Sequence, residues 1–210
     1  MRNRPLVIVK VGGSLLAWDE LPQRLQAWLA RRPAGTYFLI AGAGPLGDVI
    51  RQADERFHLG EERSHWLCVD ALAITARLLS HLLDDAPLID TLTALRQMRD
   101  SRDGVTKSYV FDPRSFLREV EPTQGGNRLP HTWDVTTDSI AARLVECASA
   151  DELVLLKSCD PAATIIDAAC DAGYVDRHFA QAARTLDRVT CVNLRGTGEP
   201  VLLRRPSHGG

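Results

Sequence analysis

The stretch Leu6-Val7-Ile8-Val9-Lys10-Val11-Gly12-Gly13-Ser14 joins a short apolar run to a glycine turn, and a helical pattern of leucines follows it. It predicts a buried strand over residues 6–11 whose carboxyl end opens into a helix. The glycines let backbone N–H groups approach an anion, Ser14 can cap the helix, and the helix N-terminus adds partial positive charge. Lys10 places a full charge beside this turn. The stretch therefore favours a phosphate-binding turn, with a tight turn that binds nothing as the alternative; its spacing is neither GxxxxGKS nor GxGxxG.

Short β-rich runs alternate with longer helical patterns along the chain, which is typical of an α/β fold with a mainly parallel sheet. The other predicted strands cover residues 37–41, 153–156 and 189–194. Helical spacing of apolar residues predicts a helix from Leu15 to Leu29 and a second one from Glu61 to Leu83, whose stripe is expected in the core or a subunit interface. Residues 101–130 are polar and rich in turn signals, so loops are expected there.

Composition narrows the class of protein. The chain has 210 residues, is 45% hydrophobic and carries a net charge of -2. This length suffices for one core, so we expect a single domain over residues 1–203 and a disordered tail over 204–210. The charge gives no broad attraction to nucleic acid or to an anionic membrane, and it favours a small metabolite as partner. No run reaches the roughly 18 apolar residues of a membrane span, and five cysteines without a CxxC pair indicate reduced thiols, so a cytoplasmic location is expected.

A second glycine turn, Ala41-Gly42-Ala43-Gly44-Pro45, follows the strand predicted over residues 37–41. Ligands of open α/β sheets bind at the carboxyl ends of the strands, so the two glycine turns are expected to face one another across a shared crevice. Arg51 can pair there with an acceptor phosphate or carboxylate, and Asp48 can orient it. A solvated pair of surface charges is the alternative for these two side chains.

A third motif, His131-Thr132-Trp133-Asp134-Val135-Thr136-Thr137-Asp138-Ser139, precedes another helical pattern. Hydroxyls and a carboxylate suit a helix start, so capping alone can explain Thr136, Thr137 and Asp138. It does not explain His131 and Trp133, which lie on the approach to the same turn.

Lys157 ends the apolar run over residues 153–156 and is expected at the same sheet edge as the glycine turns. Asp138 can then hold Lys10 and Lys157 in position without transferring a proton itself. Phosphoryl transfer needs mainly in-line positioning and positive charge, which this set supplies. The catalytic candidates are thus Lys10, Asp138 and Lys157. No metal site made by the protein is expected, because the six histidines lack a ligand spacing such as HExxH.

The three motifs resemble those of the amino acid kinase family, which includes aspartokinase and bacterial UMP kinase, and their order and spacing agree over most of the chain. The resemblance implies a three-layer αβα sandwich, a homo-oligomer, and transfer of the γ-phosphoryl group of ATP, with Mg²⁺, to a carboxylate, carbamate or phosphate. It puts Gly12, Gly13, Ser14, Ser158, Asp160 and Tyr174 on the nucleotide side. The acceptor side would comprise Gly42, Ala43, Gly44, Asp48, Arg51, His131, Trp133, Thr136 and Thr137.

A narrower resemblance, to the archaeal-type kinases of methanofuran synthesis, rests on Ser64-His65-Trp66, the motif from His131 to Ser139, and Val192-Asn193-Leu194-Arg195-Gly196. It implies a small phosphorylated acceptor, an aminomethylfuran methyl phosphate of one-carbon metabolism. The Thr-Asp-Val-Asp-Gly type of turn common in the family is replaced by Ser158-Cys159-Asp160-Pro161. Two alternatives therefore stay open: a kinase that forms an acyl phosphate on a carboxylate, and a non-catalytic nucleotide-responsive or assembly subunit.

Overall fold

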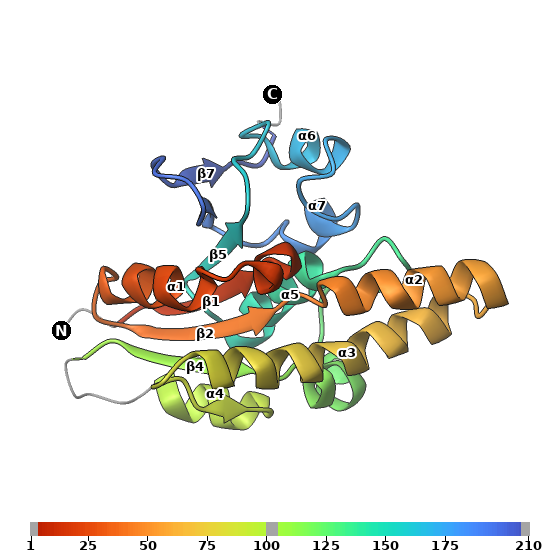
Figure 1. Cartoon of the computed structure of the whole chain (residues 1–210), viewed down its shortest axis with the longest axis horizontal. Coiled ribbons are helices and arrows are strands. Elements are labelled where there is room, and N and C mark those ends of the chain that lie inside the picture. Colours follow the sequence, from red (N-terminus) through yellow and green to blue (C-terminus); the bar gives the residue numbers. More distant parts are fainter. Residues whose placement is uncertain (1–3, 100–104, 207–210) are drawn as a thin grey trace.

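A seven-stranded sheet forms the centre of the computed structural model, which describes residues 4–99 and 105–206. The strands lie in the order β3-β4-β2-β1-β5-β6-β7 (Figure 1). Neighbouring strands are parallel except for β7, which is antiparallel to β6. Their bounds are β1 Leu6–Val11, β2 Thr36–Ala41, β3 Leu88–Ile89, β4 Lys107–Phe111, β5 Glu152–Lys157, β6 Val189–Asn193 and β7 Val201–Leu203. The mainly parallel α/β sheet expected from the sequence is confirmed.

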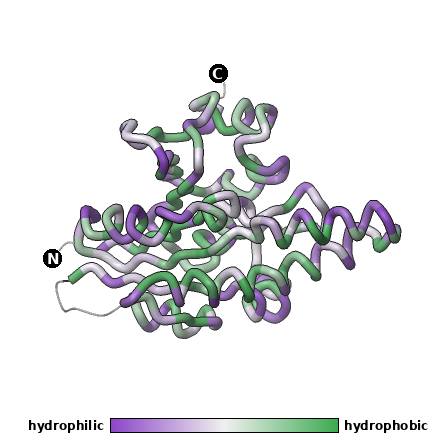
Figure 2. The backbone as a smooth tube through the Cα atoms, in the orientation of Figure 1, coloured by the Kyte–Doolittle hydropathy of each residue, from purple (hydrophilic) through white to green (hydrophobic). Residues whose placement is uncertain are grey.

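Helices cover both faces of this sheet. Their bounds are α1 Leu21–Ala30, α2 Pro45–Phe57, α3 Glu61–Leu82, α4 Leu92–Arg99, α5 Thr137–Ala148, α6 Ile166–Asp171 and α7 Phe179–Ala182. On one face, Val7 and Val9 of β1 belong to the same buried cluster as Leu25 of α1. On the other face, Leu6 and Ile8 belong to a cluster with Leu144 of α5. The strands between the two clusters are largely hydrophobic (Figure 2). The sheet with helices on each face forms the three-layer αβα arrangement that was expected.

The alternation of strand side chains decides where the two lysines lie. Because successive side chains point to opposite faces, Lys10 shares the face of Leu6 and Ile8. By the same rule Lys157 shares the face of Leu153 and Leu155, which lie in the same cluster as Leu6 and Ile8. Since β1 and β5 are adjacent and parallel, both lysines emerge at one sheet edge, on the side covered by α5.

The long helix α3 packs beside α2, and the pair extends beyond the sheet (Figure 1). The apolar stripe predicted over this helix divides into two parts. Val69, Leu72 and Leu79 are among its buried residues, as a core role requires, whereas Leu67 is exposed; Ile74 and Leu78, which lie outside the predicted stripe, are exposed as well. The homo-oligomer implied by the family resemblance stays a prediction, and this exposed row is the part of α3 that is free to contribute to an interface.

Several element boundaries differ from the prediction. The helix expected from Leu15 to Leu29 is a 3₁₀ turn, Gly13–Ala17, followed by α1, because Trp18 adopts an extended conformation between them. The segment expected to be loops contains β4 and helical turns at Phe116–Val120 and Glu121–Thr123. Residues 101–104 of that segment lie outside the described residues. β3 and β7 were also missed, since strands of two and three residues leave too short a pattern to detect.

One residue of the predicted tail, Arg204, is paired with another part of the chain. Arg204 bridges to Ile165, and its backbone exchanges hydrogen bonds with Thr164 and Ile166. The expectation of disorder from residue 204 is thus wrong for Arg204 itself, while residues 207–210 lie outside the described part of the chain. None of the helices within the described ranges has the length and hydrophobicity that crossing a bilayer requires.

Candidate active site

The carboxylate of Asp138 lies between the two lysines, as the sequence predicted. Asp138 stands in the first turn of α5 and is 3% exposed. Its Oδ1 is 2.9 Å from Nζ of Lys10, and its Oδ2 accepts a hydrogen bond of 2.7 Å from Nζ of Lys157. Two of the three lysines in the chain thus converge on one carboxylate. The structure therefore brings the three catalytic candidates together at a single buried point.

Burial and charge shift the protonation equilibria of this cluster in opposite senses. Burial lowers the pKa of Lys10 to about 8, with the attraction of Asp138 opposing this change and the repulsion of Lys157 adding to it. Burial alone would raise the pKa of Asp138, but Lys10 and Lys157 together hold it at about 2. At neutral pH the cluster consequently combines an ionised Asp138 carboxylate with a charged Lys10 ammonium.

The two glycine turns touch each other through their backbones. A Cβ atom added at Gly13 would lie 2.5 Å from the backbone nitrogen of Gly44, and one at Gly42 would lie 2.7 Å from that of Gly13. Gly44 also has a φ of +58°, which L side chains rarely adopt. Both turns follow the carboxyl ends of adjacent strands, β1 and β2. The predicted facing glycine turns therefore meet in direct backbone contact and leave no crevice between them, and only glycine permits this approach.

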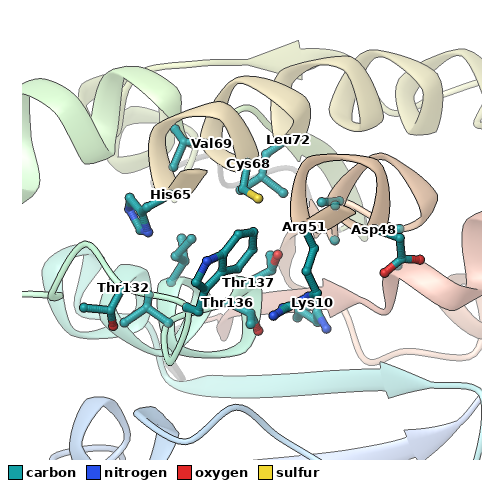
Figure 3. A pocket seen from close by; sticks show the side chains of 18 residues that line it. Lys10, Asp48, Arg51, His65, Cys68, Val69, Leu72, Thr132, Thr136 and Thr137 are labelled. Carbon is teal, nitrogen blue, oxygen red and sulfur yellow. The ribbon is translucent and has the colours of Figure 1, made fainter. Parts of the chain in front are cut away.

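A cavity of about 220 Å³ opens beside the glycine turns. Lys10 and Arg51 contribute positive charge to its wall, and the side chain of Arg51 points from α2 toward Lys10 (Figure 3). The rest of the wall is mixed. It contains glycines, threonine hydroxyls and an apolar side formed by α3 and α5. The lining residues predicted from the sequence are Lys10, Gly13, Gly42, Ala43, Gly44, Asp48, Arg51, Trp133, Thr136 and Thr137.

The indole of Trp133, in the loop before α5, is fixed against α2. Its Nε1 donates a hydrogen bond of 2.7 Å to Asp54, and the guanidinium of Arg51 lies 4.2 Å from the ring centroid. A cation over an aromatic face is held by attraction to the ring quadrupole. Trp133 therefore positions Arg51 at the cavity, a contact that the sequence did not reveal.

His131 was predicted beside the acceptor, but the structure does not place it on the cavity wall. Its ring stacks on His65 at 5.1 Å between centroids and lies 4.6 Å from the ring of Trp66. His65 lines the cavity instead. Burial, and after it the neighbouring His131, lower the pKa of His65 to about 4, so its ring is neutral at neutral pH. His131 thus packs against His65, which lines the cavity, and does not line the cavity itself.

The residues predicted on the nucleotide side gather at the ends of β1, β5 and β6. Ser14 does not cap a helix; its hydroxyl lies 3.0 Å from that of Ser158. Asp160 accepts a hydrogen bond of 3.0 Å from the amide of Asn193. The ring of Tyr174 lies 5.3 Å from Nζ of Lys157. These groups border the lysine cluster on the side away from the glycine turn at Gly42.

Thr136 also fails to act as the cap that its position suggested. The Thr136 side chain makes no capping hydrogen bond, and its hydroxyl donates to Asp176 over 2.8 Å. The carboxylate of Asp176 takes over the capping role, because it also accepts from the backbone N–H of Ser139 at 3.0 Å. Sequence reasoning missed this because the two partners lie about forty residues apart.

The sequence missed the part of the cavity wall supplied by α3, and the apolar residues that follow Trp133. These residues read as core, since a helical stripe does not distinguish packing against a sheet from lining a small cavity. The missed residues of these two groups are His65, Cys68, Val69, Leu72, Val135 and Ile140, and Gly47 and Thr132 also line the cavity without having been predicted. The tripeptide Ser64-His65-Trp66 carried the only available signal, because a polar aromatic residue interrupts the apolar stripe there.

Comparisons with known proteins support the fold. No family model and no curated protein sequence matches the chain. Among solved structures, UMP kinase from Bacillus anthracis matches 97% of this chain and 100% of its own, with 12% identity and a TM-score of 0.62. Aspartate kinase from Synechocystis matches 97% of this chain and 40% of its own, with 14% identity and a TM-score of 0.63. UMP kinase from Ureaplasma parvum matches 92% of this chain and 91% of its own, with 11% identity and a TM-score of 0.59.

These likenesses establish the fold predicted from the sequence motifs. The chain spans the whole length of one UMP kinase and less than half of the aspartate kinase. Its three-layer architecture is that of the amino acid kinases.

Proposed function

We propose that this chain, which has the amino acid kinase fold, is an ATP-dependent small-molecule kinase. The observation that carries the proposal is the convergence of Lys10 and Lys157 on buried Asp138, beside two glycine turns in backbone contact. Each buried charge carries a desolvation cost and none improves packing, so three such charges at one sheet edge favour a functional role. Positive charge and glycine turns without side chains at that edge suit phosphate groups.

The state of Asp138 narrows the class of acceptor. Both of its oxygens are engaged by ammonium groups, and its pKa of about 2 makes it a poor general base. An acceptor whose attacking oxygen is already ionised needs no base, so a phosphate or carboxylate fits this site better than an alcohol. In the reaction, the acceptor oxygen bonds to the γ-phosphorus as the bond to the bridging oxygen breaks and ADP leaves.

Mg²⁺ fits this site as a companion of the nucleotide. Asp138 is already neutralised by two lysines, so the phosphate oxygens of ATP would supply ligands for the ion, which commonly binds through substrate phosphates. When bound, Mg²⁺ supplies additional charge neutralisation to the transferring group. Ser14, Ser158 and Asp160 are the side chains of this chain that would face the nucleotide side.

Among ionised acceptors we propose a phosphate, with an aminomethylfuran methyl phosphate of one-carbon cofactor synthesis as the specific candidate. Lys10 and Arg51 give the cavity two cations for such a group, and the apolar side from α3 suits a compact ring. We also propose that the protein is a cytoplasmic homo-oligomer.

The acceptor is tested by incubating the protein with Mg-ATP and this furan phosphate, in parallel with simple carboxylates, and following the products by ³¹P NMR. Diphosphate formation supports the proposal, whereas turnover of carboxylates alone contradicts the assigned acceptor.

Arg51→Ala is expected to raise the KM of a phosphorylated acceptor about tenfold or more, because it removes a bidentate charged donor. The KM of a carboxylate acceptor should rise only about two- to threefold, because its two oxygens can still form an ion pair with the ammonium group of Lys10. Steady-state kinetics with both acceptors measures this difference. Arg51→Lys is the matched control: it keeps the charge but loses the planar fork, so an intermediate effect is expected. Equal losses for both acceptors would contradict a phosphate-binding role.

The pKa of Lys10 predicts an alkaline limit to activity. Because this pKa is lowered to about 8, the ammonium is charged below that pH and is progressively lost above it. The kcat/KM for Mg-ATP, which reports the free enzyme, should therefore be level up to about pH 8 and then fall roughly tenfold per pH unit. Lys10→Arg, although less active, should lack this decline because a guanidinium stays charged. A wild-type profile that remains level to about pH 10 would contradict the assignment.

A further inference from the structure

Asp176 lies against the N-terminus of α5, the helix that carries Asp138. Its Oδ2 accepts hydrogen bonds from the backbone N–H of Thr136 at 2.9 Å and from that of Ser139 at 3.0 Å. The hydroxyl of Thr136 donates to the same oxygen, and the hydroxyl of Ser139 donates to Oδ1. Four donors of one helix start thus converge on one carboxylate from a distant part of the chain.

This arrangement supplies what the helix lacks locally. The first N–H groups of an α-helix have no partner within the helix, and Thr136 at the N-cap provides no side-chain acceptor. A carboxylate at this end also interacts favourably with the helix dipole. Asp138 stands one residue before Ser139, so the turn that Asp176 fixes is the turn that sets the position of the Asp138 side chain.

The segment Gly173–His178, which contains Asp176, contacts the same cluster at further points. The carbonyl oxygen of Tyr174 accepts a hydrogen bond of 2.9 Å from Nζ of Lys157. The backbone N–H of His178 donates to the carbonyl of Asp134, in the loop before α5. The segment therefore holds one lysine directly and the shared carboxylate through its helix.

We propose that Asp176 is a positioning residue that fixes the first turn of α5, and thereby holds Asp138 between Lys10 and Lys157. It does not touch the reacting groups. Its importance for turnover rests on the proposed kinase function, but its effect on the lysines does not, so the two can be tested apart.

The first test is competitive amine labelling at a fixed pH, quantified by mass spectrometry of the folded protein. The chain has three lysines, so Lys107 serves as the internal reference for Lys10 and Lys157. Asp176→Ala should raise the labelling of Lys10 and Lys157 relative to Lys107 by at least about threefold, because both lose a fixed counter-charge and Lys10 becomes accessible. Asp171→Ala, which removes an exposed carboxylate from the nearby end of α6, should leave the ratios unchanged.

The second test is turnover with Mg-ATP. Asp176→Ala should lower kcat about 10- to 100-fold with the KM of the acceptor within about twofold, because misplacement of the catalytic cluster affects the transition state most. Asp176→Asn retains one acceptor oxygen and should recover part of kcat and of the protection from labelling. It also carries the test if Asp176→Ala does not fold.

The outcomes separate the two claims. Wild-type labelling ratios in a folded Asp176 variant would overturn the positioning role, whether or not the protein is a kinase. A wild-type protein without phosphoryl transfer, in which labelling still responds to Asp176, would overturn the proposed function and leave the positioning role intact.

Discussion

Asp138→Asn is expected to lower kcat by about 10³-fold while leaving the overall fold intact. The substitution preserves the shape of the side chain but removes the charge that holds Lys10 and Lys157 at 2.9 and 2.7 Å. Preorganised charge at the site of transfer is commonly the largest single contribution to catalysis, and loss of one group costs roughly 10²–10³-fold. Here one change disturbs two such groups together.

The same variant should also be less stable. Removal of one partner from a buried ion cluster leaves uncompensated charge and typically costs about 3–5 kcal/mol, although Lys10, with its lowered pKa, can lose its proton and reduce this cost. Steady-state kinetics and urea unfolding measure the two effects. Asp134→Asn is the control, since it removes a half-exposed carboxylate four residues upstream. Turnover within about tenfold of wild type in Asp138→Asn would contradict the role given to Asp138.

Gly13→Ala is expected to lower kcat about 10²-fold and to reduce the unfolding free energy by about 1–3 kcal/mol. Its Cβ would lie 2.5 Å from the nitrogen and 2.7 Å from the Cα of Gly44, and both are backbone atoms that cannot rotate away. The two glycine turns must then separate, so groups bound on either side lose their alignment.

Kinetics and a thermal melt of this variant provide the measurement. Gly125→Ala is the matched control, because a Cβ atom there meets nothing within 4 Å and should change neither quantity. A Gly13→Ala protein with wild-type turnover would show that close contact of the turns is not required.

Local patterns predicted most of the sheet and the chemical centre. The run from Leu6 to Ser14 identified β1 and its glycine turn, because a buried strand and an abrupt glycine pair are both legible within nine residues. Lys157 was found for the same reason, since it ends a strand of buried apolar residues. Strand alternation and parallel pairing then bring both lysines to one edge without further information.

Contacts between distant segments could not be predicted in this way. Arg143 is an example: it is 1% exposed, and it donates to Glu121 at 3.1 Å and to the carbonyl of Gly125 at 2.8 Å. In the sequence Arg143 resembles a solvent-exposed charged residue of a helix. The capping of α5 by Asp176 and the fixing of Trp133 by Asp54 are of the same kind, because spacing carries no record of which loop returns to which helix.

The central claim is that Lys10, Asp138 and Lys157 form a site for the phosphates of a nucleotide. It is tested most directly by calorimetric titration of the purified protein with Mg-ATP, beside a Lys10→Ala variant and with a furan methyl phosphate or a simple carboxylate present. We expect the wild-type protein to bind Mg-ATP, and the variant to bind at least about tenfold more weakly, because a charged phosphate contact is lost. Absence of Mg-ATP binding by the wild-type protein with every acceptor, or equal binding by both proteins, would contradict the claim.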